Sequence, residues 1–419
     1  MRTLLGTGAH SIHVQNVARS LYEAGWLRRY ETGAVDVWRS PLLRELRARA
    51  GSAFPRVDRE LKRRQISQVP HDLVYPHKRW DIPRVVLERF VGAARTGDWL
   101  WERGEHALAD RFARLMETDS FDLYVGVEHG ALEALRACRN TGKTGVCMFL
   151  SPHHAFLSKW LAPEFEEHPE LLSSARQQIE AKNRERYERV DEEMQTAHVV
   201  RANSSLTARS LIEAGLDPDR IVTVPLGGPP PLDEPTVPAD GPTRVIYAGP
   251  LSVRKGFHYL LDAWRRLQPS GAELHAYGVP SLPSHLLRSL PPGLVLHGSV
   301  PRSELMAAYQ HAHLLVIPTL CDGFGMVISE ALSRGVPVLT TSNAGAADLI
   351  EEGKNGYVVP PADADALAAQ LDACLRSPDA LVAMRPYALD TARSWTWEHF
   401  RRAFTDRLAE HVGVPVRND

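Results

Sequence analysis

The second half of the chain alternates short apolar runs with amphipathic stretches. Uniformly apolar runs of four to six residues are typical of strands buried on both faces, and parallel strands need crossover helices between them. The alternation therefore predicts a parallel, doubly wound α/β sheet. The predicted strands are 244–248, 273–277, 294–296, 313–317, 336–340 and 357–359, and the predicted helices are 257–267, 302–311, 327–334 and 363–374.

The first half shows a similar but less regular pattern. It opens with an apolar run at 3–5 that is closed by Gly6-Thr7-Gly8. An amphipathic helix follows, with apolar residues at three- and four-residue steps from Val14 to Leu21 and a stop at Gly25. We expect a second α/β domain here. Its further predicted strands are 121–127, 144–150, 197–201 and 220–225.

A proline-rich segment separates the two halves. Residues 227–242 read GGPPPLDEPTVPADGP, and proline removes the N–H donors that helices and central strands need. We therefore predict a first domain at 1–228, a semi-rigid linker at 229–242 and a second domain at 243–394.

Composition narrows the class of protein. The 419 residues include 49 basic and 51 acidic side chains, a formal net charge of -2, which disfavours a dedicated nucleic-acid binder. The four cysteines form no CxxC pair, which argues against a disulfide scaffold or a structural zinc site. The N-terminus MRTLLGTGAH is too short in apolar residues for a signal peptide, and no run approaches a membrane span. We expect a cytoplasmic protein.

Residues 40–116 fit two interpretations. The segment is dense in arginine, and this would form a basic face for an anionic membrane or a phosphorylated acceptor. The same residues also fit a solvated helix face without a partner. The basic residues concerned are Arg44, Arg47, Arg49, Arg56, Arg59, Lys62, Arg63 and Arg64.

The loop Gly249-Pro250-Leu251-Ser252-Val253-Arg254-Lys255-Gly256 lies between a predicted strand and a predicted helix. Doubly wound sheets bind ligands at the carboxyl ends of their strands. Gly249 permits a sharp turn, while Arg254 and Lys255 place cations beside a helix N-terminus. This combination suits a diphosphate, although an ordinary strand–helix loop with exposed basic residues also fits.

A second loop, residues 319–325, carries two glycines and leads into a helix predicted near Met326. Asp322 lies in the loop and Glu330 about one turn into the helix. Two carboxylates beside an anion would repel it unless they bind something else, and sugar hydroxyls donate strong hydrogen bonds to carboxylates. The two loops together predict a nucleotide-sugar site.

These motifs resemble the retaining glycosyltransferases of family 4, which have the GT-B fold. The resemblance rests on VIYAGPLSVRKGFHYLL at 245–261, LLVIPTLCDGFGMVISEALSRGVPVL at 314–339, and the stretches 342–350 and 353–360, and it is strong over most of 196–375. It implies two Rossmann-like domains facing across a cleft. It also implies a terminal segment, 395–419, that crosses back to the first domain.

The resemblance assigns roles to the second domain's residues. Glu330 would hold the donor ribose and Asp322 the sugar hydroxyls, at the spacing of the family's two glutamates but with a shorter acid at 322. Backbone N–H groups of the helix start would face the sugar and diphosphate. Pro250 stands where the family has an arginine, so Arg254 beside Lys255 is a candidate substitute. The full predicted donor set is Gly249, Arg254, Lys255, Gly323, Phe324, Gly325, Met326, Val327 and Glu330.

In the first half, the run 145–154 delivers His153 and His154 into a loop after a predicted strand. Family members carry a histidine near the reacting carbon in that loop, so His153 is our first catalytic candidate and His154 our second, with Asp322 as the third predicted catalytic residue. A surface role for both histidines is the plain alternative. Gly8, His10 and His129 are predicted to line the acceptor side. Gly6 and Gly8 also fit a dinucleotide-binding turn, but its third glycine would fall at Ser11.

The activity implied is transfer of a sugar from a nucleoside diphosphate to an unidentified acceptor, with retention and without a metal or cofactor. The acceptor classes left open are a saccharide, a lipid-linked compound and a small molecule, with no nucleic acid as partner and with peripheral contact to the inner membrane face allowed. Because Pro250 and Asp322 depart from the family, a catalytically silent nucleotide-sugar sensor is one alternative. A GT-B sugar epimerase or phosphorylase is another.

Overall fold

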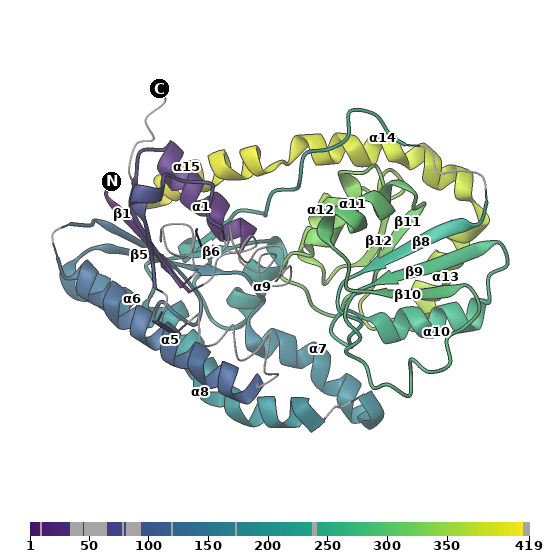
Figure 1. Cartoon of the computed structure of the whole chain (residues 1–419), viewed down its shortest axis with the longest axis horizontal. Helices are drawn as coiled ribbons and strands as arrows, with labels where there is room; N and C mark the ends of the chain where they lie inside the picture. Colours follow the sequence, from purple (N-terminus) through teal and green to yellow (C-terminus); the bar gives the residue numbers. More distant parts are fainter. Residues whose placement is uncertain are drawn as a thin grey trace.

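The computed structural model describes residues 1–8, 11–33, 45, 65–77, 79–80, 94–118, 120–171, 174–236 and 241–413. Within them the chain forms two lobes, each built on one parallel sheet (Figure 1). The predicted arginine-dense residues from 44 to 64, other than residue 45, lie outside the described residues, as does His10. None of the helices in the described part of the chain combines the length and apolarity that a membrane-spanning segment requires.

The first sheet has seven strands in the order β3-β2-β1-β4-β5-β6-β7, and every neighbouring pair is parallel. Its strands are β1 (Thr3–Thr7), β2 (Leu27–Thr32), β3 (Val74–Pro76), β4 (Leu123–Val127), β5 (Thr144–Phe149), β6 (Val199–Ala202) and β7 (Ile221–Thr223). This order reverses direction at β1, as in a doubly wound Rossmann-like sheet.

The helices of the first lobe cover both faces of this sheet. They are α1 (Ile12–Glu23), α5 (Ala94–Met116), α6 (Leu132–Thr141), α7 (His154–Glu167), α8 (Ser174–Thr196) and α9 (Ser205–Glu213), with short 3-10 turns η2 (His71–Leu73), η4 (Pro169–Leu171) and η5 (Pro218–Arg220). One apolar cluster joins α5 and α6 to the sheet through Phe112, Tyr124 and Leu135. The predicted strands of the first half are confirmed, whereas β2, β3 and most of these helices were not predicted.

The second sheet has six parallel strands in the order β10-β9-β8-β11-β12-β13. All the strands and helices predicted for this half are confirmed to within a few residues. They are β8 (Thr243–Ala248), α10 (Phe257–Leu267), β9 (Ala272–Tyr277), β10 (Leu294–Gly298), α11 (Arg302–Gln310), β11 (Leu314–Ile317), α12 (Met326–Leu332), β12 (Val338–Thr341), β13 (Gly356–Val359) and α13 (Ala364–Arg376). The 3-10 turn η6 (Gly345–Leu349) was not predicted.

The chain crosses between the lobes twice, at neighbouring points. The outgoing segment, residues 224–242, has no helix or strand over its described residues, as its prolines predicted. It lies beside the returning segment, because Gly228 N donates to Trp395 O at 3.1 Å. A Cβ at Gly227 would lie 2.6 Å from the Cα of Trp397, so the crossing requires glycine there. The exact domain limits 1–228, 229–242 and 243–394 stay predictions.

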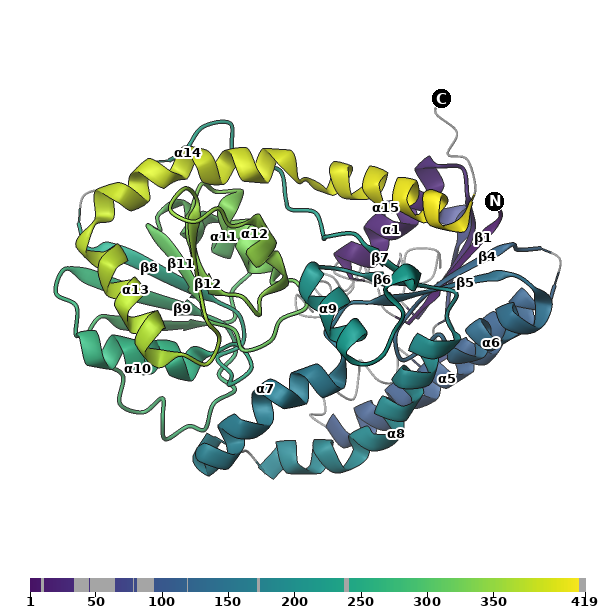
Figure 2. The same cartoon turned by 180° about the vertical axis from the view of Figure 1, so that it is seen from behind.

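The returning segment consists of α14 (Pro378–Ser394) and α15 (Trp397–Val412), which run along one side of both lobes (Figures 1 and 2). Helix α15 packs against α1, where Ser20 Oγ donates to Arg401 O at 2.5 Å. Phe400 and Phe404 are buried in the main core. The predicted return of the C-terminal segment to the first domain is therefore confirmed.

Candidate functional site

Two loops of the second lobe are bonded together at the carboxyl ends of β8 and β11. They are residues 249–256 and residues 318–325. The backbone N–H of Leu320 donates to Arg254 O at 3.0 Å, and Thr319 Oγ1 donates to the same oxygen at 2.9 Å. The two loops predicted to share one ligand are thus adjacent.

Glycine is required where the loops approach most closely. Gly256 has a φ of 68°, and a Cβ there would clash with the carbonyl oxygen of Pro318. The left-handed backbone alone disfavours other residues, and the contact excludes them. Because Gly256 precedes α10, it fixes the position of Lys255 relative to the second loop.

The pairing of Lys255 with Asp322 is the main electrostatic feature of these loops. Lys255 Nζ forms an ion pair with Asp322 Oδ2, and the two side chains are only 13% and 14% exposed. Because partial burial reduces screening by solvent, the pair is a stronger constraint than a surface salt bridge. The structure therefore brings together two residues that the sequence assigned to one donor site.

Glu330 lies in the neighbouring helix α12 and is paired with a residue that was not predicted. Arg302 Nε donates to Glu330 Oε1 at 2.9 Å. Burial raises the pKa of Glu330, and the nearby Arg302 opposes this shift. Arg302 begins α11 after Pro301, and its position in the sequence carried no signal that would distinguish it from other surface arginines.

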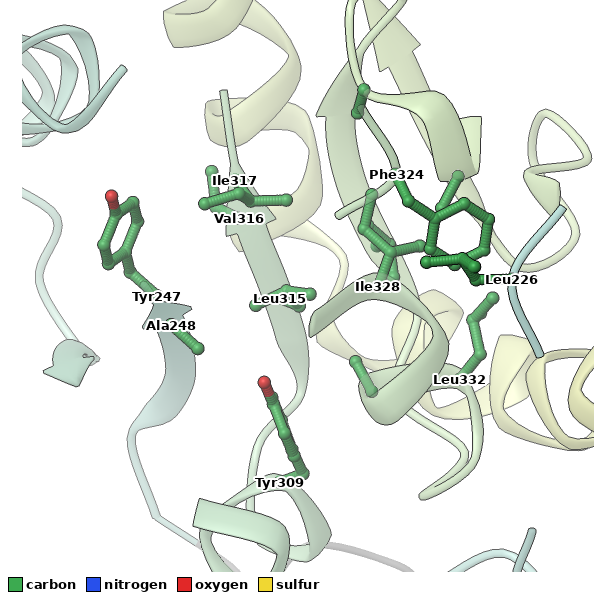
Figure 3. Packing of buried hydrophobic residues seen from close by; sticks show 14 of the residues in the cluster. Leu226, Tyr247, Ala248, Tyr309, Leu315, Val316, Ile317, Phe324, Ile328 and Leu332 are labelled. Atoms are coloured by element: carbon green, nitrogen blue, oxygen red, sulfur yellow. The ribbon is translucent and has the colours of Figure 1, made fainter. Parts of the chain in front are cut away.

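The start of α12 is anchored by its apolar neighbours. Gly325 precedes the helix with a φ of 85°, and the helix begins at Met326 as predicted. Figure 3 shows Phe324 and Ile328 beside Leu226, which belongs to the outgoing segment between the lobes. Packing therefore ties the loop that carries Gly323 to the junction of the two lobes, together with the first turn of α12, where Val327 is partly buried.

Arg254 was predicted to replace the arginine that the family has at the position of Pro250, and the structure supports this only in part. The Arg254 side chain is exposed, and the contact with the second loop is made by its carbonyl oxygen. Pro250 O accepts a hydrogen bond from Tyr247 Oη at 2.7 Å. Gly249 has a φ of 139°, so the turn that was predicted there needs glycine. A diphosphate role for Arg254 stays a prediction.

The same loop touches the first lobe directly. Ser204 Oγ donates to Gly323 O at 2.6 Å. A Cβ at Gly323 would lie 2.5 Å from Leu150 O and 3.1 Å from the Cα of Ser151. The loop 318–325 therefore meets the carboxyl ends of β5 and β6 without any intervening side chain at 323.

A cavity of about 810 Å³ lies in the first lobe at the carboxyl ends of β1, β4 and β5. Among the residues that line it are Gly8 and His129, both predicted on the acceptor side, and also Leu150 and Ser151. Because Leu150 and Ser151 also lie close to Gly323, the cavity adjoins the loop 318–325, which carries Asp322.

His153 and His154 do not line this cavity. The Nε2 atoms of both rings lie 2.7 Å from Asp191 Oδ1 on α8. The His153 side chain is 5% exposed, and burial lowers its pKa, with a further contribution from the charge of His154. The His154 ring stacks on Tyr187 at 4.2 Å. The first catalytic candidates thus point toward Asp191 on α8, and their role at the reacting carbon stays a prediction.

His153, His154 and Asp191 also form the group among the described residues that could hold a metal ion. Their ligand atoms lie within 4.8 Å of one another. The His153 Nδ1 atom accepts a hydrogen bond from Ala155 N at 3.3 Å. In a neutral ring the proton must then be on Nε2, which donates to Asp191. Because a metal would need that nitrogen unprotonated, the geometry fits a hydrogen-bonded cluster better than a metal site.

His129 is held in a conformation that is unusual for its type. Its φ is 76°, in the left-handed region. The backbone is fixed from α8, because His129 N donates to Glu193 Oε2 at 2.6 Å and Arg189 Nε donates to His129 O at 3.0 Å. Burial, with the charges of Arg186 and Arg189, lowers the pKa of His129 to about 4. The ring is therefore neutral at pH 7.

Glu128 is a site residue that sequence reasoning missed. It lines the cavity, and its Oε1 accepts hydrogen bonds from Leu150 N and Ser151 N, both at 3.1 Å. Burial raises the pKa of Glu128 to about 8. The signal that could have identified it is its place beside His129 directly after a buried strand.

Comparison with known proteins agrees with this geometry. Residues 242–377 match the family model described as Glycosyl transferases group 1. The putative colanic acid biosynthesis glycosyltransferase WcaL of Salmonella typhimurium is 28% identical over 183 residues, 40% of this chain and 45% of that protein. The D-inositol 3-phosphate glycosyltransferase of Corynebacterium urealyticum is 35% identical over 99 residues, 24% of this chain and 23% of that protein. The chain thus spans less than half the length of these curated relatives.

Solved structures match over the whole chain. HepE of Anabaena in complex with UDP has a TM-score of 0.62 at 16% identity, covering 98% of this chain and 100% of that one. The lipopolysaccharide outer core galactosyltransferase WaaB has a TM-score of 0.63 at 14% identity, covering 98% and 99%. The two sheets and the returning helix therefore define a protein of the GT-B fold. Within that fold, residues 242–377 are similar to the group 1 glycosyltransferases.

Proposed function

We propose that this protein is a retaining glycosyltransferase that moves a sugar from a nucleoside diphosphate to an acceptor bound in the first lobe. The observation that carries the proposal is the Lys255–Asp322 pair beside a cavity in the opposite lobe. HepE was solved with UDP-glucose as well as with UDP, which supports a nucleotide sugar as the donor.

In this proposal the residues of the second lobe bind and activate the donor. Lys255 and the backbone N–H groups at the start of α12 stabilise the diphosphate as the anomeric C–O bond breaks and negative charge develops on the leaving group. Glu330 accepts hydrogen bonds from the ribose, and Asp322 accepts them from the transferred sugar. When the diphosphate is bound, Lys255 is shared between it and Asp322.

The acceptor hydroxyl attacks the anomeric carbon from the cavity side. Its oxygen forms the new bond, and its proton passes to the leaving diphosphate, so atoms and charge balance without a protein nucleophile. Attack on the face from which the diphosphate leaves gives retention. Leu150 and Ser151, packed against Gly323, exclude water between the two substrates.

A thermal-shift screen with UDP, GDP, ADP and their glucose or mannose derivatives tests the donor half. A ligand at 100 times its Kd stabilises the folded protein by about 2.7 kcal/mol, and we expect Glu330→Ala to abolish the shift. Release of nucleoside diphosphate from the stabilising donor then separates an enzyme from a silent sensor. If none of these compounds raises the melting temperature, the proposal is wrong.

A further inference from the structure

The cavity in the first lobe is built around two carboxyl groups from different elements. Glu105 comes from α5 and Glu128 from the end of β4. A Cβ at Gly130 would lie 2.6 Å from Glu105 Oε2, and one at Gly8 would clash with Glu105 Oε1. The absence of side chains at these two positions lets the Glu105 carboxylate reach the carboxyl ends of β1 and β4.

An aromatic ring lies in the same cavity with its orientation fixed. Arg186 Cζ lies 5.1 Å from the centre of the Trp101 ring. The centres of the His129 and Trp101 rings are 6.1 Å apart, and the angle between the two ring planes is 68°. Cation–π and edge-to-face contacts of this kind hold a ring in one plane. Trp101 therefore offers the cavity an apolar surface of fixed direction.

The charges of the cavity disfavour an anionic or purely apolar acceptor. Arg111 lines it but is bonded to the buried Glu31, with Arg111 Nε 2.8 Å from Glu31 Oε2. Arg79 lies over the Trp80 ring at 5.3 Å. A phosphate would have to approach the Glu105 carboxylate, and a lipid chain would bury the carboxyl groups of Glu105 and Glu128 without offering either a hydrogen bond.

A polar atom in the cavity wall also lacks a partner. The His129 Nδ1 atom is buried and has no hydrogen bond within the described part of the chain. Such an atom costs free energy unless a ligand or water satisfies it. In a neutral ring it is either a donor or an acceptor, and a hydroxyl group complements both.

We propose that the cavity binds a neutral saccharide acceptor, with a pyranose ring against Trp101 and hydroxyl groups bonded to Glu105, Glu128 and His129. The C–H groups on one face of a pyranose pack on an aromatic ring, while its equatorial hydroxyls meet the Glu105 carboxylate, the Glu128 carboxyl group and the imidazole. The role as acceptor site rests on the proposed function. Through Leu150 and Ser151, the saccharide lies next to Gly323 of the donor-side loop.

Saturation-transfer NMR without any donor tests the saccharide itself. The probes are maltose, lactose and cellobiose, each against wild type, Glu105→Gln and Trp101→Ala. We expect at least one disaccharide to bind wild type and its Kd to rise about tenfold or more in both variants. The reason is that Glu105→Gln removes one charged hydrogen bond and Trp101→Ala removes the stacking surface. Trp101→Phe keeps an aromatic face and should recover part of the affinity.

Glu117→Gln is the matched control, because Glu117 is exposed just beyond the end of α5 and does not line the cavity. Two further probes are glycerol 3-phosphate and vesicles of phosphatidylglycerol. Binding of only these anionic probes, binding of none of the five, or disaccharide binding unchanged in Glu105→Gln and Trp101→Ala would each overturn the inference. Because no donor is present, these outcomes are independent of the nucleotide screen that tests the proposed function.

Discussion

The Lys255 ammonium is ion-paired with the Asp322 carboxylate, so a cation and an acid from two separate loops occupy one partly buried position. Both loops are also tied by backbone hydrogen bonds through Arg254 O. The cation is thereby held at a fixed place before any substrate arrives. Such preorganisation is what makes electrostatic stabilisation of a leaving group effective.

Lys255→Ala should therefore impair catalysis without unfolding the protein. We expect kcat with the donor identified by the nucleotide screen to fall about 100-fold, the usual cost of removing one preorganised stabilising group. Release of nucleoside diphosphate measures it. Lys354→Ala is the control, since Lys354 is an exposed residue paired with Glu351. Equal rates for Lys255→Ala and wild type would remove Lys255 from the mechanism.

Glu128 should make stability depend on pH. Burial raises its pKa from 4.5 to about 8. Between those values the folded protein keeps a proton that the unfolded chain releases, so stability falls as pH rises through this window. Glu128→Gln removes that contribution. We expect the melting temperature of the variant to fall less between pH 5 and pH 8 than that of wild type.

A residual slope should remain in Glu128→Gln, because burial also raises the pKa of Glu193 to about 7. The informative quantity is thus the difference between the two proteins at each pH. If wild type and Glu128→Gln lose stability in parallel, the Glu128 carboxyl is not protonated at neutral pH.

The second sheet was predictable because its strands and helices can be recognised from short stretches of sequence. Four of its six strands are followed by an α-helix, namely β8, β10, β11 and β13. Both loops lie between a strand and a helix, so the joining of Lys255 and Asp322 follows from topology. The first lobe was harder, because β2 contains Arg28, Arg29 and Glu31 and does not read as an apolar run. Buried Glu31 is paired there with Arg29 of the same strand and with His77 and Arg111 from distant segments.

The direction of the histidines could not be read from sequence. The apolar run at 144–150 correctly predicts that His153 follows a strand, β5. The direction of its ring, however, is set by its hydrogen bond to Asp191, which lies 38 residues later on α8. Likewise, the role of Glu105 depends on glycines at 8 and 130 that meet it only in the fold. Contacts of this kind depend on how helices pack on the sheet, which periodicity does not specify.

Glu164 should stabilise the contact between the lobes. On α7, its two carboxylate oxygens lie 2.9 Å from His258 Nε2 and 2.6 Å from Tyr259 Oη on α10. Burial alone would raise the pKa of Glu164, but these bonds outweigh it and the pKa lies below its ordinary value. Its stabilising effect is therefore present above about pH 4.5 and is lost as pH falls through the lowered pKa.

A double-mutant cycle with Glu164→Gln and Tyr259→Phe measures this contact. We expect a coupling free energy of about 0.5–3 kcal/mol at pH 7 from urea unfolding, because the two side chains are bonded directly. Glu166→Gln, at an exposed position of the same helix, should show no coupling with Tyr259→Phe. Additive effects of Glu164→Gln and Tyr259→Phe would show that the bond contributes nothing to the closed arrangement.

The left-handed backbone at His129 should separate stability from function. The backbone at position 129 has a φ of 76°. An alanine in this left-handed conformation lowers the free energy of unfolding, whereas a glycine adopts it without strain. Because both variants lack the imidazole, His129→Gly should be more stable than His129→Ala by about 1 kcal/mol, measured by urea unfolding. Both should lose most transfer to the acceptor while nucleotide binding is unchanged, since the ring lines the cavity and not the donor loops. If His129→Gly were as active as wild type, the strained residue would serve only the fold, and His129 would not contact the acceptor.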